Sequence, residues 1–148
     1  LTHFDEFGEC IYCHVLDQEL AGSTRIVYES EHFVAFVQFA ALTPFSMLIM
    51  PRRHMACFSE IKDAEAVDLA HNLRRTLAKL YRGLDDPDFN YTIRTAPSEY
   101  VGVRYVHWYV SIIPRLTKMA GFELGSGMFI NVSLPEENAS FLRGVKVE

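Results

Sequence analysis

Apolar residues recur along the chain with the two spacings that distinguish strands from helices. Runs rich in β-branched and aromatic residues predict five strands, at 24–30, 33–38, 46–50, 90–95 and 105–113. The run at 46–50 is apolar after Ser46, enough to predict a strand that is buried on both faces. In the last run Val106, Trp108 and Val110 share one face, so we expect Trp108 to lie in the core.

Two further segments follow the spacing of a helix. Between residues 63 and 82, apolar residues recur three and four positions apart, which predicts one long amphipathic helix. Pro135 suits the first position of a helix, so we expect a short C-terminal helix that runs to Leu142. The predicted fold is α+β, an antiparallel sheet of about five strands with the long helix on one face. Because no Pro-, Gly- or Ser-rich linker divides the chain, we expect residues 1–148 to form a single domain.

Composition narrows the classes of partner. The chain of 148 residues carries a net charge of -5 and has no basic cluster beyond two arginine pairs, which argues against a nucleic-acid binder. No run approaches the roughly 20 apolar residues of a membrane helix, and no secretory signal pattern is visible. The three cysteines suit a reducing compartment better than a disulfide framework. We therefore expect a cytoplasmic protein without membrane or nucleic-acid partners.

Two of the cysteines, Cys10 and Cys13, form a C-x-x-C pair, a spacing that lets two thiolates bind one metal ion. A redox pair or a chance occurrence remains an alternative for this motif alone. A closed site needs two more ligands. His54 follows a predicted strand, and His107 lies inside one, where a buried imidazole needs a partner. Spacing does not single out these two histidines; the other four lie in polar stretches, where we expect them to be solvated: His3, His14, His32 and His71.

The order of several motifs resembles the histidine-triad (HIT) superfamily, and within it the galactose-1-phosphate uridylyltransferase branch. The motifs are the C-x-x-C pair, residues 25–36 and the segment from Pro44 to His54. Residues 39–45 and 122–127 resemble the second of that enzyme's two tandem domains. The resemblance extends from Cys10 to about Leu142. It implies a HIT-like fold and the C-terminal half of a two-domain protein.

The resemblance also implies a set of metal ligands. Family members that bind zinc use the C-x-x-C pair, a histidine after the strand that ends in proline, and the first histidine of the signature H-x-H-x-H. These positions are Cys10, Cys13, His54 and His107 here. Four protein ligands leave no open position, so the resemblance implies a structural Zn²⁺ rather than a catalytic one.

The rest of the signature differs from the family. The middle histidine of the triad attacks the α-phosphate in this superfamily, but the second and third positions are Tyr109 and Ser111 here. A phenol with a pKa of about 10 is protonated at neutral pH and is a poor substitute for imidazole. We therefore expect no catalytic residue in this domain, and no activity of the domain alone. In the two-domain enzymes, the nucleophile belongs to the first domain.

The resemblance assigns a substrate-contacting role to the segment 118–128. Lys118 would neutralise phosphate, Phe122 would stack on a base or sugar, and Gly125 and Ser126 lie in the Gly-rich part that an anion would approach. Gly-rich segments also form ordinary turns, and a single lysine is usually solvated. The implied partners are a sugar nucleotide or hexose phosphate, and either a second copy or a second HIT-like domain.

The sequence is compatible with three functions. The first is a domain of a UDP-glucose–hexose-1-phosphate uridylyltransferase-like enzyme that contributes zinc-stabilised structure and part of the sugar-nucleotide pocket. The second is a free-standing, non-catalytic module that binds a nucleotide or sugar phosphate. The third is a zinc-stabilised dimerisation domain without a ligand.

Overall fold

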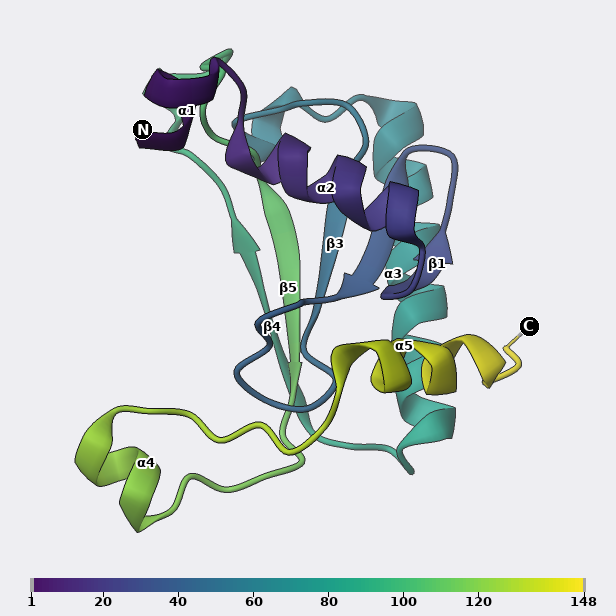
Figure 1. The fold of residues 1–148 in the computed structure, drawn as a ribbon. Coiled ribbons are helices and arrows are strands. Elements are labelled where there is room, and N and C mark those ends of the chain that lie inside the picture. The colour runs from purple at the N-terminus through teal and green to yellow at the C-terminus, as the bar shows by residue number, and fades with distance from the viewer. Residues whose placement is uncertain (1, 148) are drawn as a thin grey trace.

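A five-stranded antiparallel sheet forms the centre of the molecule, as predicted (Figure 1). The structure is a computed structural model and describes residues 2–147. The strand order is β1-β2-β3-β5-β4, and every neighbouring pair is antiparallel. The strands are β1 (Ile26–Glu29), β2 (Phe33–Val37), β3 (Met47–Pro51), β4 (Phe89–Arg94) and β5 (Tyr109–Pro114).

The long helix and the C-terminal helix are also confirmed, and three more helices accompany them. The predicted pair are α3 (Asp63–Gly83) and α5 (Pro135–Gly144). The additional helices are α1 (Thr2–Phe7), α2 (Ile11–Gly22) and α4 (Gly121–Ser126), and short 3₁₀ turns occupy Phe58–Glu60 and Ser98–Tyr100. None of the helices in residues 2–147 is long and apolar enough to cross a membrane.

The sheet has a hydrophobic core on each of its faces. On the α3 and α5 face, Phe33, Ile49 and Trp108 pack with residues of both helices. On the other face, α2 contributes Leu16, which packs on Phe36 and neighbouring strand residues. All residues of β2 and β3 are buried, which confirms the expectation for 46–50. The sheet therefore lies between helices on both faces rather than under one long helix.

Strand β5 is shorter than the sequence pattern predicted. It begins at Tyr109, which pairs with Arg94, the last residue of β4. Residues before Tyr109 have no partner on β4, so the segment 105–108 is irregular, although the Trp108 amide donates a hydrogen bond to the Met55 carbonyl oxygen over 2.9 Å. His107 therefore precedes the strand instead of lying within it. The Trp108 side chain is fully buried, as predicted.

The segment 115–134 leaves the end of β5, carries α4 and returns to α5, and we call it the arm. It projects from the rest of the domain (Figure 1). Between α4 and α5, the Asn131 side-chain amide donates a hydrogen bond to the Ala41 carbonyl oxygen over 2.9 Å. This bond ties the C-terminal part of the arm to the rest of the domain. Its apolar side chains are largely exposed: Leu116, Met119, Phe122, Leu124, Met128, Phe129, Ile130, Val132 and Leu134.

Candidate functional site

The structure brings Cys10, Cys13, His54 and His107 together from three segments of the chain. Their potential ligand atoms all lie within 4.8 Å of one another. Cys13 Sγ lies 3.2 Å from His54 Nδ1 and 3.4 Å from His107 Nδ1. Cys10 occupies the N-cap position of α2 and Cys13 lies in its first turn, while His54 follows β3 and His107 precedes β5. We call this group the metal centre, because it can bind a metal ion.

The donor set fits a tetrahedral zinc ion. Zn–S and Zn–N bonds of about 2.3 and 2.0–2.1 Å place neighbouring ligand atoms about 3.3 to 3.8 Å apart, so the observed spacing needs only small side-chain shifts. His54 Nε2 lies 3.0 Å from the Val103 carbonyl oxygen. When Nε2–H donates this hydrogen bond, the lone pair of Nδ1 is directed toward the centre. Two thiols and two imidazoles that meet through Nδ1 match a closed Cys₂His₂ site.

The thiols of Cys10 and Cys13 shift each other's pKa in opposite directions. A hydrogen bond from the Cys13 thiol, assisted by His107, lowers the pKa of Cys10 to about 3 against the opposing effect of burial. The same hydrogen bond, together with burial, raises the pKa of Cys13. A divalent cation held by both sulfur atoms would require both thiols to be deprotonated.

Salt bridges and hydrogen bonds fix the segment that carries His54. Arg53 donates from Nε and Nη2 to the two carboxylate oxygens of Glu65, each over 2.8 Å, and Glu65 also accepts from the Lys62 amide. The Arg53 guanidinium lowers the pKa of the buried Glu65 to about 2. Arg52 forms an ion pair with Glu29 of β1. These contacts hold the chain on the N-terminal side of His54 against α3 and β1.

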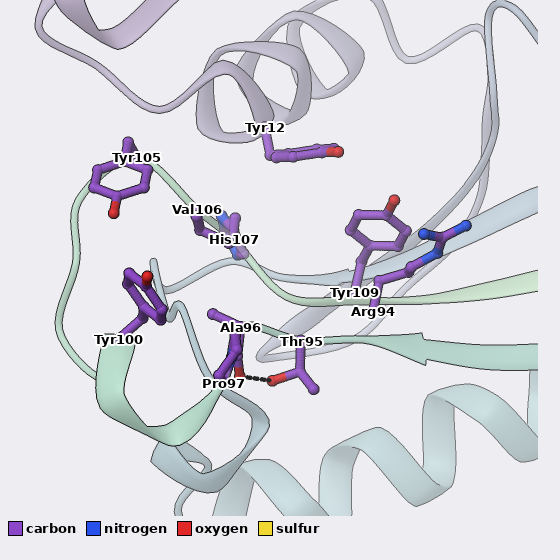
Figure 2. A pocket seen from close by; sticks show the side chains of 10 residues that line it. All are labelled: Tyr12, Arg94, Thr95, Ala96, Pro97, Tyr100, Tyr105, Val106, His107 and Tyr109. Atoms are coloured by element: carbon purple, nitrogen blue, oxygen red, sulfur yellow. Dashed lines mark hydrogen bonds between the residues drawn. The ribbon is translucent and has the colours of Figure 1, made fainter. Parts of the chain in front are cut away.

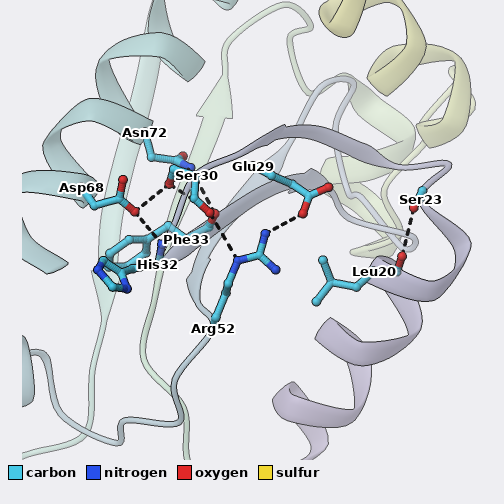
Figure 3. A network of polar contacts seen from close by, with 9 residues as sticks. All are labelled: Leu20, Ser23, Glu29, Ser30, His32, Phe33, Arg52, Asp68 and Asn72. Atoms are coloured by element: carbon cyan, nitrogen blue, oxygen red, sulfur yellow. Dashed lines mark hydrogen bonds and ion pairs between the residues drawn. The ribbon is translucent and has the colours of Figure 1, made fainter.

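A second network, shown in Figure 3, ties α3 to the turn between β1 and β2. The Asp68 carboxylate accepts hydrogen bonds from Ser30 Oγ over 2.8 Å and from the His32 amide over 2.7 Å. The side-chain amide of the fully buried Asn72 donates to Ser30 Oγ over 3.0 Å. These groups are satisfied by one another, which indicates a structural role for this network rather than a binding role.

The other histidines do not reach the metal centre. His71 is exposed, as expected, but His3, His14 and His32 are partly buried rather than fully solvated. His14 Nδ1 lies 2.8 Å from a Glu9 carboxylate oxygen, which accounts for its position.

Tyr109 lies at the junction of three hollows on the α2 face of the sheet. Their volumes are about 480, 440 and 400 Å³, and Tyr109 lines all three. We call these three neighbouring hollows, which share Tyr109, the trough. Figure 2 shows the largest, with Tyr12 of α2 above Tyr109, and their ring centroids are 5.2 Å apart. Burial, with a hydrogen bond to Tyr109, raises the pKa of Tyr12 to about 12. Ser111 lines one hollow, and His107 is the only histidine among the described residues of the trough.

The sequence did not identify two residues of the trough. Tyr12 stands inside the C-x-x-C motif, and its role becomes visible only once α2 is placed on the sheet. Arg94 lines two of the hollows and forms no ion pair with any residue of 2–147. A single arginine at the end of a strand gives no signal in the sequence.

The four residues expected to contact substrate all lie on the arm and are exposed. Lys118 precedes α4, whereas Phe122, Gly125 and Ser126 belong to it. Ser126 Oγ donates to the Phe122 carbonyl oxygen over 2.7 Å within this helix. None of the four lines the trough or the metal centre in the described structure. Another arm residue, Phe129, does line one of the hollows.

The chain matches known proteins over almost its whole length. Residues 2–143 match the family described as galactose-1-phosphate uridyl transferase, C-terminal domain. ADP-glucose phosphorylase of Arabidopsis thaliana is 36% identical over 98% of this chain and 40% of the relative. Galactose-1-phosphate uridylyltransferase of Thermotoga maritima is also 36% identical, over 98% of this chain and 48% of the relative. The chain thus spans less than half of each of these relatives.

Solved structures agree with the sequence matches. The crystal structure of an Arabidopsis thaliana ADP-glucose phosphorylase with bound ADP-glucose has a TM-score of 0.84 and 36% identity, over 99% of this chain and 46% of that chain. A uridylyltransferase structure has a TM-score of 0.88 and 28% identity, over 96% of this chain and 46% of that chain. A Zn-bound histidine triad family protein from Mycobacterium smegmatis, 20% identical with a TM-score of 0.60, shares the fold. The chain therefore belongs to the galactose-1-phosphate uridyl transferase C-terminal domain family, a HIT-like fold.

Proposed function

We propose that this chain serves as the C-terminal, HIT-like half of a nucleotidyltransferase that acts on a sugar nucleotide and a hexose 1-phosphate. The observation that carries the proposal is a family fold in which Tyr109 and Ser111 occupy the second and third triad positions. Because His107 supplies the only imidazole among the described residues that line the trough, the nucleophile of such an enzyme would come from its other half. The domain alone would be inactive and would contribute structure and part of the sugar-nucleotide pocket.

The metal centre would bind zinc in a structural role. Bound zinc would supply four bonds that join the start of α2, the segment after β3 and the segment before β5, and it would leave no open position for substrate. Cys10 and Cys13 would provide thiolates, while His54 and His107 would provide neutral imidazole Nδ1 atoms. The assembled donor set supports this role.

Two exposed surfaces support pairing with a second HIT-like domain or with a second copy of the chain. All six residues of β4 are exposed, and β4 pairs only with β5 among the described strands, so its outer edge offers unpaired backbone groups. Phe89, Tyr91 and Ile93 add apolar area on the α3 face of this edge. The apolar arm would reach a partner as well, and Lys118 and Phe122 would contact the substrate's phosphate and sugar there.

A specific observation also favours the free-standing binding module. The largest hollow of the trough includes Tyr12, Tyr100, Tyr105 and Tyr109 in its lining, and Arg94 has no carboxylate partner among the described residues. An unpaired guanidinium beside a hollow suits a phosphate group. In this second reading, the chain binds a nucleotide or sugar phosphate without chemistry. The exposed β4 edge alone would suit the third reading, a zinc-stabilised dimerisation domain.

Enzyme assays, the coding sequence upstream of residue 1 and binding measurements test these three hypotheses. We expect the purified 148-residue chain to transfer no nucleotidyl group from UDP-glucose or ADP-glucose to a hexose phosphate or to phosphate; turnover by the pure chain would overturn the proposal. A reading frame that continues upstream into another C-x-x-C and a complete triad would exclude the free-standing module. Titration calorimetry with both sugar nucleotides would argue against a pure dimerisation domain if either bound at micromolar concentration.

A further inference from the structure

The metal centre is accessible from solvent through a hollow of its own. This hollow, of about 300 Å³, is lined by Cys10, Cys13 and His54, which are three of the four candidate ligands. Phe4 of α1 and the exposed Arg104 form part of its walls. Cys10 is only 4% exposed, whereas Cys13 is partly exposed. A molecule of the size of a peroxide can therefore approach the Cys13 sulfur without unfolding of the domain.

The two sulfurs are placed to form a disulfide with each other. Cys10 and Cys13 are separated by one helical turn at the start of α2, and their Sγ atoms lie within 4.8 Å. C-x-x-C pairs at helix starts are the usual site of reversible disulfides. The third thiol of the chain is engaged elsewhere, because Cys57 Sγ donates to the Pro97 carbonyl oxygen over 3.2 Å and is buried. It would not compete for a sulfenic acid formed at Cys13.

We infer that Cys10 and Cys13 form an oxidation site for hydroperoxides, at which a disulfide forms and the metal is released. This inference rests on the zinc proposed above. With both thiols deprotonated in the proposed zinc-loaded centre, the more exposed Cys13 thiolate attacks the O–O bond of hydrogen peroxide, which gives a sulfenic acid and, after protonation of the leaving hydroxide, one water. The Cys10 thiolate then attacks the Cys13 sulfur and displaces a second hydroxide, which is protonated to water. Two thiolates, one peroxide and two protons thus yield one disulfide and two waters, and Zn²⁺ leaves because a disulfide is a poor ligand.

Release of the metal acts on the trough through α2. The C-terminal half of α2 keeps its contacts, since Leu16 is buried and Glu19 forms an ion pair with Arg25 over 2.9 Å. Its first turn loses the bonds to His54 and His107. Tyr12 belongs to this turn and packs on Tyr109. Oxidation would therefore loosen the first turn of α2, which forms one wall of the trough, while the sheet stays folded.

The test uses the intact chain and a matched Cys57→Ala variant, first reduced and assayed for zinc. On titration with hydrogen peroxide, we expect zinc release measured with a chromogenic chelator to parallel a mass loss of about 2 Da, the two hydrogens lost in disulfide formation. Peptide mapping should locate the disulfide between Cys10 and Cys13 in both proteins, and dithiothreitol with zinc should reverse the change. Hydrogen exchange should rise several-fold in residues 10–14 and 102–107 and stay unchanged in β2 and β3.

The outcomes separate this inference from the zinc proposal. A reduced chain without zinc would overturn the proposed metal centre. A zinc-loaded chain that keeps its metal under peroxide, or loses it only with sulfinic acid at Cys13 and no disulfide, would overturn the oxidation site alone. Release that depends on Cys57 would overturn it as well.

Discussion

Removal of His107 tests the metal centre most directly. The His107 side chain is 2% exposed, and its Nδ1 lies 3.4 Å from Cys13 Sγ. Structural zinc sites contribute about 10–16 kcal/mol in small peptides, which is about 3 kcal/mol for each of four ligands. We therefore expect His107→Ala to weaken zinc binding by at least about 100-fold and to lower the free energy of unfolding by about 3 kcal/mol. For a domain of this size, that loss corresponds to a fall in Tm of about 6–12 °C.

The assay combines metal content by mass spectrometry with thermal unfolding, both after passage over a chelating resin in reducing buffer. The matched control is His32→Ala, because the His32 imidazole is partly exposed, lies 3.8 Å from a Glu31 carboxylate oxygen and is not one of the four candidate ligands. We expect about one zinc per chain in the wild type and in this control. Cys10→Ala should behave as His107→Ala does. A His107→Ala protein that keeps its zinc and melts with the control would refute the four-ligand centre.

Three further predictions concern stability and association. Arg53 depresses the pKa of Glu65 from 4.5 to about 2, so the folded state gains stability above pH 4.5 that is lost as pH falls toward 2. Glu65→Gln should therefore make the denaturant midpoint of unfolding less dependent on pH between 4.5 and 2. An unchanged pH profile would contradict the Arg53–Glu65 ion pair. Lys79 donates to three carbonyl oxygens at the end of α5 over 2.8 to 3.2 Å. Lys79→Met should therefore lower the free energy of unfolding in urea by about 2–3 kcal/mol. Lys118→Met, on the exposed arm, should leave it almost unchanged. Tyr91→Lys on the β4 edge should leave stability within about 0.5 kcal/mol but weaken any dimer detected by analytical ultracentrifugation, and an unaltered dimer would place the interface elsewhere.

The elements with strong periodicity were predictable. The apolar run at 46–50 is β3, buried on both faces, and the helical spacing after residue 62 is α3. In both cases a local pattern and the tertiary environment agree. The family resemblance added the pairing of Cys10 and Cys13 with His54 and His107, residues up to 97 positions apart that no local pattern connects.

The features that were missed depend on long-range contacts. Helix α2 starts at Ile11, and its N-cap residue Cys10 forms no side-chain capping bond, so the usual N-terminal signal is absent. The first part of the run 105–113 has strand-forming residues but no partner strand, since β4 ends opposite Tyr109. The trough follows from both facts, because it lies where α2 meets the start of β5. Arg94 and Tyr12 therefore had no detectable role in the sequence alone.

The structure places the three signature positions in two different surroundings. His107 lies before β5 and directs its Nδ1 atom toward Cys13, so it belongs to the metal centre. Tyr109 and Ser111 lie within β5 and line the trough, where Tyr109 packs on Tyr12. A change at either of the latter positions alters the hollow and its chemistry but breaks no metal ligand. A change at His107 would remove one of the four candidate ligands, and with zinc bound as proposed, the junction of three chain segments would lose stability. Under the proposed function, His107 would serve the structure through zinc, whereas Tyr109 and Ser111, which line the trough, stand where the resemblance implies histidines.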